Sequence, residues 1–392
     1  MIQTILVYLS TMTSMYFLCR KSYLVEKKSH RKSFQFLFLA IIIFSLVFGM
    51  RYYVGIDYHS YFDVYVNDSY EILRFEPGFM FLTVLIKNTH AHYVVYFSLL
   101  AFLQLSFFFF SFRKQKYLLP FLCIMLFMTG TFMCGWMNVI RQTLATTIFV
   151  FASSFLIHKG LRNLIIYLLL ISLAISFHYS SAILLVIPII WRFKVDWISC
   201  KKAQYMILLI AFLGQLLGIN QLFMGAVDLL GGLFSWDDYL DQVHEGATVG
   251  AIGMYDILTF VLNLLVVSYS SSLKTFYRKD DFFPYIYKVG FFGIIVSYVF
   301  SSSMLISRML LFFNIFQFPL YAYLFYYFSR LIKIKRFRHL YLYVWIYFIL
   351  GFVRVMIDMD LNTSRYVFYF QDDLHPLKER LLNQTLQNAR QN

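Results

Sequence analysis

The segment between Arg51 and Phe79 holds side chains that could carry out chemistry. It is polar, its five acidic residues outnumber its two arginines, and apolar runs flank it on both sides. Two of its carboxylates could act as a general base toward a hydroxyl group: Asp57, within VGIDYHSY, and Glu76, which precedes a Pro–Gly pair. Structural roles stay open for both. Pro–Gly predicts a helix start that Glu76 would cap, and Asp57 could pair with Arg51.

Ionisable residues at the ends of the apolar runs form a second group of candidates. Such residues are costly inside a membrane and usually face a cavity where they serve function. The guanidinium group suits bidentate recognition of phosphate, which predicts a phosphate-bearing ligand such as a lipid-linked sugar. The alternative is that each arginine reaches lipid headgroups or pairs with a structural acid. The residues concerned are Arg51, Arg141, Arg308 and Arg354.

The composition is that of a membrane protein. Of 392 residues, 60% are hydrophobic and only 14% are charged, whereas soluble domains have about 25% charged residues. Repeated apolar runs of roughly 15 to 23 residues predict an all-α polytopic integral membrane protein, with about 12 transmembrane helices plus short re-entrant or interfacial helices. The net charge of +14 lies mostly in short loops, which favours the positive-inside rule over nucleic-acid binding. The four cysteines have no metal-type spacing.

The order of the apolar runs predicts the topology. We expect one polytopic domain over residues 1–370, with external loops at about 51–92 and 220–253, and a polar tail over 371–392. The first apolar run lacks the features of a cleaved signal and is expected to be a retained span with the N-terminus outside. The helix predicted over 77–87 is too short to span, so it should be re-entrant or lie along the outer surface.

His178 lies in an apolar run that is long for one crossing and short for two. Basic residues flank residues 164–190 on both sides, so both ends should face the cytoplasm and the chain must turn within the run. The sequence SFHYSS indicates the turn, which would place His178 at membrane depth. There it could act as a base, donate a hydrogen bond to substrate, or be a satisfied core residue.

Five short pieces of the sequence occur in an order typical of one family. They are RYYVGIDYHSY (51–61), EPGF (76–79), NVIRQTLA (138–145), SFHYSSAIL (176–184) and SRMLLFFNIFQFP (307–319). With these pieces the chain resembles the EpsG family, bacterial membrane proteins related to the Wzy-type polysaccharide polymerases. Tyr53 departs from the family pattern, in which a smaller residue precedes the VGxDY core.

The resemblance implies a GT-C-like or Wzy-like architecture and a glycosyltransferase. Such an enzyme polymerises undecaprenyl-diphosphate-linked oligosaccharide repeat units at the periplasmic face of the bacterial inner membrane, in O-antigen or exopolysaccharide biosynthesis. Lipid-linked units would be both donor and acceptor, and membrane lipid, a chain-length regulator and a flippase would be its partners. No cofactor, metal or nucleic acid is expected. The alternatives are a flippase or transporter of lipid-linked oligosaccharide, or an O-antigen ligase-type enzyme.

The resemblance also implies roles for the candidate residues. Arg141 and Arg308 would hold the donor diphosphate, whose departure requires positive charge, and Arg51 would assist them or hold the second lipid. Asp57 or His178 would take the proton of the attacking hydroxyl. The remaining candidates are Glu76 as a further catalytic acid or base, Arg354 as a further diphosphate ligand, and Tyr58, Tyr61 and Gln142 as ligands of sugar or lipid.

Overall fold

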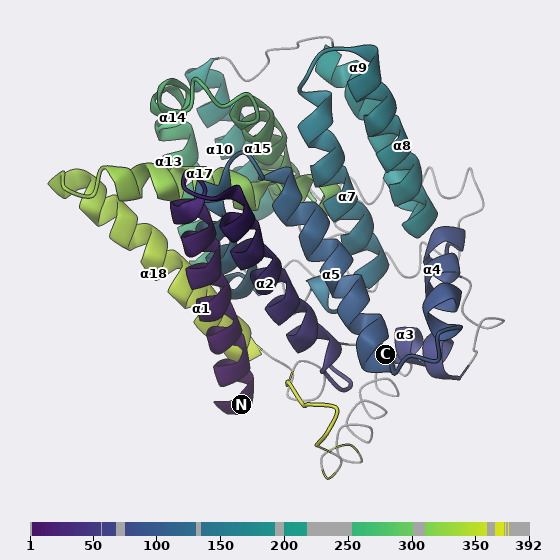
Figure 1. Ribbon diagram of the computed structural model, residues 1–392. Coiled ribbons are helices and arrows are strands. Elements are labelled where there is room, and N and C mark those ends of the chain that lie inside the picture. Colours follow the sequence, from purple (N-terminus) through teal and green to yellow (C-terminus); the bar gives the residue numbers. More distant parts are fainter. Residues whose placement is uncertain are drawn as a thin grey trace. The chain divides into compact units, whose positions relative to one another are not determined.

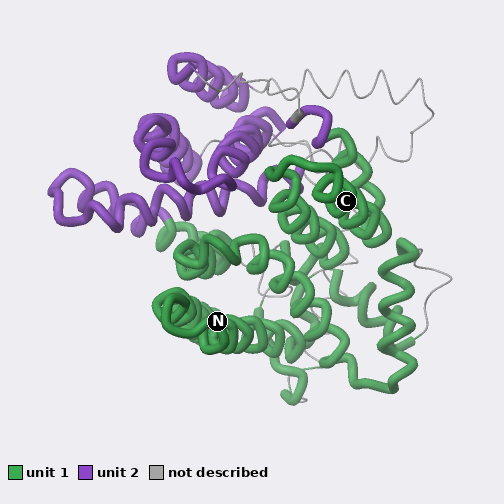
Figure 2. The backbone as a smooth tube through the Cα atoms, turned by 45° about the horizontal axis from the view of Figure 1, so that its top comes forward, with its two compact units in different colours: residues 1–186, 348–392 green, residues 187–347 purple. Residues whose placement is uncertain are grey.

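The regular secondary structure in the part of the chain that the computed structural model describes consists of helices (Figure 1). That part comprises residues 2–55, 57–67, 75–130, 135–192, 200–217, 253–300, 310–358, 365–371, 373 and 375. Within it there is no β-strand, and an isolated antiparallel bridge joins Arg51 to Phe368. The chain divides into two compact units (Figure 2), unit 1 with Met1–Val186 and Phe348–Asn392, and unit 2 with Ile187–Tyr347. The predicted all-α class is confirmed.

Several helices are long and apolar enough to cross a membrane. Within the described residues there are five, or six if one pair of helices bent by 55° forms a single span. Further apolar helices have 10–17 residues. These helices are consistent with the predicted multi-pass membrane protein, and the number of about 12 spans stays a prediction. The five long helices are Ile2–Val25, His30–Gly49, Tyr93–Ser111, Leu310–Arg330 and Lys335–Ile357.

Unit 1 is a row of helices that pack side by side in chain order. α1 packs on α2, α2 on α5, α5 on α7 and α7 on α8, while α6 packs on α1 (Figure 1). Aromatic rings fill much of the space between them; Trp136, for example, lies edge-on to Phe44 and Phe108. The bounds are α1 Ile2–Val25, α2 His30–Gly49, α5 Tyr93–Ser111, η1 Lys116–Leu118, α6 Leu119–Met128, α7 Ile140–Leu156 and α8 Leu161–Phe177.

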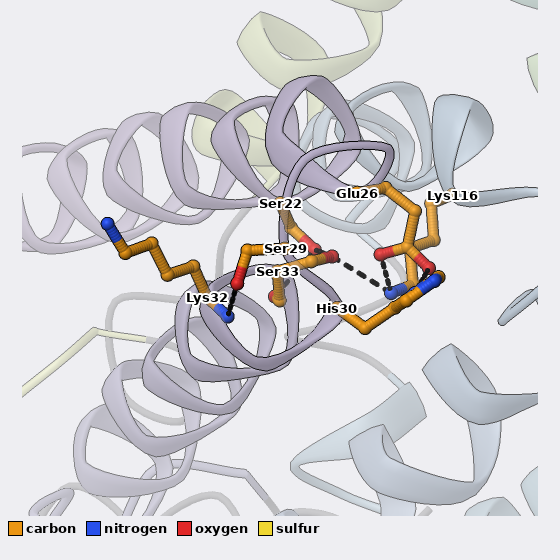
Figure 3. Close-up of polar contacts among 7 residues, drawn as sticks. All are labelled: Ser22, Glu26, Ser29, His30, Lys32, Ser33 and Lys116. Carbon is orange, nitrogen blue, oxygen red and sulfur yellow. Dashed lines mark hydrogen bonds and ion pairs between the residues drawn. The ribbon is translucent and has the colours of Figure 1, made fainter.

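Polar contacts join the α1–α2 turn to the segment that precedes α6 (Figure 3). The Glu26 carboxylate accepts hydrogen bonds from Lys116 Nζ at 2.5 Å and from His30 Nδ1 at 3.0 Å. Lys116 Nζ also lies 2.9 Å from Ser33 Oγ. The next basic segment joins the same end, because Lys114 Nζ lies 3.4 Å from His158 Nε2. The basic segments at residues 20–32, 113–116 and 158–162 therefore share one end of unit 1.

Two short helices and a helix break lie at the other end of unit 1. α3 (Tyr58–Val66) follows the Arg51 loop, and α4 (Pro77–Lys87) has the bounds expected for the non-spanning helix. α8 ends at Phe177, as the SFHYSS sequence indicates, and His178 is extended with φ −159°. The chain then turns back along α8 as the 3₁₀-helix η3 (Tyr179–Val186), where the Tyr167 hydroxyl donates to the Leu184 carbonyl at 2.8 Å.

The C-terminal segment at residues 365–371 pairs with the chain beyond α2. Tyr52 N–H donates to Val367 O at 2.9 Å, and Tyr369 N–H donates to Met50 O at 2.8 Å. The His375 ring stacks on Tyr52 with centroids 3.5 Å apart. Of the polar tail expected from residue 371 onward, residues 372, 374 and 376–392 lie outside the described part.

Unit 2 has its own helical core with polar groups inside it. The Asn263 amide donates to the Tyr298 hydroxyl at 2.8 Å and accepts from Tyr321 at 2.7 Å, and such side-chain bonds join helices in lipid. Most of the predicted external loop at 220–253 lies outside the described residues. The helices are α9 Ile187–Arg192, α10 Lys201–Leu216, α13 Met254–Ser268, α14 Ser270–Phe276, α15 Phe283–Val299, α17 Gln317–Arg330 and α18 Lys335–Asp358, whose last residues belong to unit 1.

Candidate active site

Glu76 binds two of the predicted site residues with its two carboxylate oxygens. Oε2 accepts a hydrogen bond from Arg141 Nη1, and Oε1 accepts one from His178 Nδ1 at 2.9 Å. The three residues come from the N-terminus of α4, the first turn of α7 and the C-terminus of α8. The Glu76 side chain is 7% exposed, that of Arg141 23% and that of His178 25%. A nearly buried carboxylate thus holds two groups that solvent, or a ligand, can still reach.

Gly78 lets α4 approach α8 closely enough for this contact. A Cβ atom at residue 78 would lie 2.2 Å from Ser176 Oγ and 2.8 Å from the Ser176 carbonyl oxygen, so a larger residue would push the helices apart. Pro77 occupies the first turn of α4, where its missing N–H costs nothing. Glu76 is the N-cap residue, but its side chain makes no capping hydrogen bond. The predicted capping role is therefore wrong, and the carboxylate binds Arg141 and His178 instead.

Arg141 has other contacts that fix its guanidinium group. The group lies 4.2 Å from the centroid of the Phe75 ring, and it hydrogen-bonds to the side chain of Tyr61. Its Nε–H is buried and has no hydrogen-bond partner among the described residues. Because a guanidinium has five N–H donors in a planar fork, Arg141 keeps donor capacity after binding Glu76 and Tyr61.

The charge of Glu76 settles the tautomer of His178. Burial alone would raise the pKa of Glu76, but the hydrogen bond from His178 and the positive charge of Arg141 lower it to about 2. The carboxylate is therefore ionised at neutral pH and can only accept, so Nδ1 of His178 must carry the proton. In the neutral ring, Nε2 then holds the free lone pair. Nε2 has no partner among the described residues, which leaves it available as a base.

The structure places the other predicted residues in different surroundings. Arg51 and Tyr58 are fully buried, and the Arg51 guanidinium contacts the carbonyl oxygens of Met137 and Phe48 rather than the Asp57 carboxylate. The predicted pairing of Asp57 with Arg51 is therefore not found. Asp57 is half-buried, and its N–H donates to Asn138 Oδ1 at 2.9 Å.

Of three further predicted residues, the structure records no contact of Gln142 or Arg354 with Glu76 among the described residues, and Arg308 lies outside them. Gln142 follows Arg141 in α7 and is buried, with 4% of its surface exposed. Arg354 is exposed in α18. Sequence reasoning missed Phe75, Gly78 and Asn138 as site residues, although Gly78 and Asn138 are part of the EPGF and NVIRQTLA pieces. No group of three or more His, Cys, Asp or Glu that could hold a metal occurs in the described ranges.

The model of the EpsG family matches residues 5–370, nearly the whole chain. The chain belongs to the EpsG family. EpsG is a family of Wzy-type polysaccharide polymerases, and membership in it supports a glycosyltransferase-like activity. No curated protein and no solved structure matches the chain.

Four of the five sequence pieces that resemble EpsG meet in unit 1. Glu76 of EPGF binds Arg141 of NVIRQTLA and His178 of SFHYSSAIL. Asp57 of RYYVGIDYHSY donates its N–H to Asn138, the first residue of NVIRQTLA. The pieces are far apart in the sequence, so their convergence marks the part of this EpsG-family protein where its chemistry is best sought.

Proposed function

We propose that this EpsG-family protein polymerises undecaprenyl-diphosphate-linked oligosaccharide repeat units. The observation that carries the proposal is the contact of Glu76 with both His178 and Arg141. It places a proton acceptor beside a cation that can bind phosphate, and the transfer of a sugar from a lipid diphosphate to a hydroxyl group requires both.

His178 is the proposed base. Nε2 takes the proton of the attacking hydroxyl on the non-reducing-end sugar of the acceptor, and that oxygen forms a bond to the anomeric carbon of the donor. The bond between the anomeric carbon and the lipid diphosphate breaks, and its electron pair leaves with the diphosphate. Glu76 holds the ring by Nδ1 and stabilises the imidazolium that forms, as a carboxylate behind a histidine does. Asp57 is the alternative base.

Arg141 is the proposed ligand of the departing diphosphate. Negative charge develops on the leaving group, and a preorganised guanidinium stabilises that charge more in the reaction than before it. One Nη of Arg141 binds Glu76, whereas its buried Nε–H has no partner in the described part of the chain. We propose Arg308 and Arg354 as further ligands of the lipid diphosphates, and Tyr61 and Gln142 as residues beside the sugar.

The charge distribution of unit 1 supports a site on the outer face. The basic segments at one end of unit 1 favour the cytoplasm by the positive-inside rule. α2 runs from that end to Arg51, and 20 residues of α-helix span about 30 Å, close to the thickness of the hydrocarbon core. α7 likewise runs from Arg141 to the His158 end. The site would then face the periplasm of an inner-membrane protein.

Reconstitution tests the proposal directly. Purified protein in vesicles is given a lipid-linked repeat unit, and the products are separated by size. The proposal expects a ladder of longer lipid-linked glycans, whose formation His178→Ala strongly slows and His30→Ala, at the basic end, does not. Units that change leaflet without lengthening would contradict the proposal and favour a flippase. Transfer of preformed glycan to a different acceptor, without a ladder, would contradict it and favour a ligase-type enzyme.

A further inference from the structure

Arg51 is a buried cation without a carboxylate partner in the described structure. Its side chain is 0% exposed, and its guanidinium lies 3.8 Å from the centroid of the Phe48 ring. The rings of Phe97 and Tyr58 are 5.0 and 5.4 Å away. Rings that surround a guanidinium stabilise its charge through their π faces. These rings also shield Arg51 from a ligand that approaches from solvent.

The hydrogen bonds of Arg51 point to the segment that leads into α7. Nη2 donates to Met137 O at 2.9 Å, and Nη1 lies 3.4 Å from Phe48 O. Met137 is itself 0% exposed, so its carbonyl oxygen has no access to bulk water, and a buried carbonyl that loses its donor is destabilising. Arg51 thus satisfies a buried acceptor that lies four residues before Arg141.

A second contact ties the same loop to the same segment. Asp57 N–H donates to Asn138 Oδ1 at 2.9 Å. Between Arg51 and Asp57 the loop turns sharply, with Tyr53 at φ +49° and Gly55 at φ +97°. A Cβ atom at residue 55 would lie 3.2 Å from Asn138 Oδ1, so the loop lies directly on Asn138. Both ends of the loop are therefore fastened to the residues that precede α7.

We infer that Arg51 is a positioning residue that holds the first turn of α7, and with it Arg141, in place. Its guanidinium group binds the Met137 carbonyl and contacts the surrounding rings, and Arg51 does not bind the substrate. The backbone of Arg51 is held in turn by the bridge to Phe368, so the C-terminal segment belongs to the same support. The inference rests on the proposed function and deepens it, because it assigns phosphate binding to Arg141 and the orientation of Arg141 to Arg51.

Trp136 gives a readout of this support that requires no substrate. Trp136 is adjacent to Met137, is 2% exposed, and lies 5.6 Å from Phe44 and 5.5 Å from Phe108 between ring centroids. The chain has five tryptophans, so the signal of Trp136 is isolated by subtracting the emission spectrum of Trp136→Phe from that of the otherwise identical protein. The measurement uses the full chain in nanodiscs, with acrylamide as a quencher.

Arg51→Met is expected to shift the Trp136 emission to longer wavelength and to make it more accessible to acrylamide. The matched control is Arg113→Met, which removes a guanidinium that also bonds a carbonyl, Phe110 O at 3.0 Å, and lies beside Phe151 and Phe155. Arg113 is at the basic end, and its replacement should leave Trp136 unchanged. An unshifted Trp136 in Arg51→Met would overturn the inference.

Kinetics separate positioning from binding. If the repeat-unit ladder forms, Arg51→Met should lower kcat at least about 10-fold while KM changes less than about 2-fold, since misplacing a catalytic group affects the reaction more than substrate binding. A raised KM with unchanged kcat and an unshifted Trp136 would make Arg51 a substrate ligand.

If Arg51→Met does not fold, Asn138→Ala removes the second tie and should shift Trp136 in the same direction; no shift would overturn the inference. Failure of the wild-type protein to form a ladder would contradict the proposed function alone, because the Trp136 measurement still decides the role of Arg51.

Discussion

Unit 1 has the same three kinds of side chain in contact at both of its ends. At the basic end, Glu26 accepts from Lys116 Nζ and from Nδ1 of His30. At the other end, Glu76 accepts from Arg141 and from Nδ1 of His178. Burial would raise the pKa of each glutamate, yet hydrogen bonds and a nearby cation lower both to about 2. Contact chemistry alone therefore does not distinguish a site from a structural cluster.

The two clusters differ in burial and in how the sequence builds them. His30 is 89% exposed and lies four residues after Glu26, across the turn between α1 and α2, and Glu26 is 29% exposed. Such exposed pairs contribute little to stability. Glu76 is 7% exposed, and its partners are 65 and 102 residues away in the sequence. A histidine held by a buried carboxylate has a fixed orientation and tautomer, which a base requires and a surface histidine lacks.

The largest expected effect is the difference between replacing the cation at Glu76, Arg141, and replacing the cation at Glu26, Lys116. Arg141→Ala should lower the rate of glycan elongation by at least about 1,000-fold, because it removes the proposed diphosphate ligand and the cation beside the buried carboxylate of Glu76. Lys116→Ala, at the basic end, should change the rate less than about 3-fold, as expected for a partly exposed pair. Both rates come from the reconstituted ladder assay on inserted, monodisperse protein. Near-normal polymer from Arg141→Ala would remove Arg141 from the phosphate role.

The next largest expected effect is the difference in kcat between the His178 and His30 variants. His178→Ala should lower kcat by about 100-fold or more, the usual contribution of a general base. His30→Ala should leave kcat unchanged, since its ring is exposed and bonds only to Glu26 among the described residues. The rates are measured with saturating lipid-linked repeat unit. Full activity of His178→Ala together with loss of activity in Asp57→Asn would make Asp57 the base instead.

The packing that brings Glu76 to His178 should be sensitive to one methyl group. Gly78→Ala places a Cβ atom 2.8 Å from the Ser176 carbonyl oxygen, so α4 must move away from α8. We expect a loss of about 10-fold in kcat, in line with the effect of displacing catalytic groups by a fraction of an ångström to an ångström. Gly253→Ala is the control, because its Cβ meets only Asp256 Oδ2, at 3.6 Å. Equal activities of the two variants would show that the α4–α8 contact does not position the site.

The smallest expected effect is on stability in acid. The folded-state pKa of Glu76 is about 2, below its ordinary value of 4.5, so its ionised form stabilises the folded protein above pH 4.5. That stabilisation is lost as the pH falls from 4.5 toward 2. The Tm of Glu76→Gln should therefore fall less than that of the wild type over this pH range. Glu26→Gln should reduce the loss of Tm in acid by a similar amount, because the pKa of Glu26 is also lowered to about 2. A wild-type-like acid slope in Glu76→Gln would contradict the lowered pKa.

The sequence predicted the parts of the fold that depend on apolar runs and on residues that mark where helices begin or break. Apolar runs predicted the long helices, Pro77 marked the start of α4, and the charges flanking residues 164–190 predicted the break at His178. It did not predict α3, which is a nine-residue helix within the polar segment. A short helix without a continuous apolar stripe gives a weak periodic signal.

The sequence predicted which residues belong to the candidate site but not which of them contact one another. Glu76, Arg141 and His178 were each identified, yet Glu76 was expected to cap α4. Local sequence favours capping, and only the approach of α7 and α8 gives the carboxylate better partners. The sequence also could not distinguish the role of Arg51 from that of Arg141. Arg51 is buried against a carbonyl oxygen and Arg141 is partly exposed, and both environments arise from tertiary packing.

Replacement of the two glutamates by glutamine tests the central claim, that the Glu76 cluster is the active site. Glutamine keeps the size of glutamate but loses the charge that fixes the histidine tautomer and stabilises the imidazolium. Elongation of a lipid-linked repeat unit is measured for Glu76→Gln and Glu26→Gln in the same vesicles, at equal amounts of inserted protein. We predict loss of the ladder in Glu76→Gln and a wild-type ladder in Glu26→Gln. Wild-type ladders from both variants would contradict the claim.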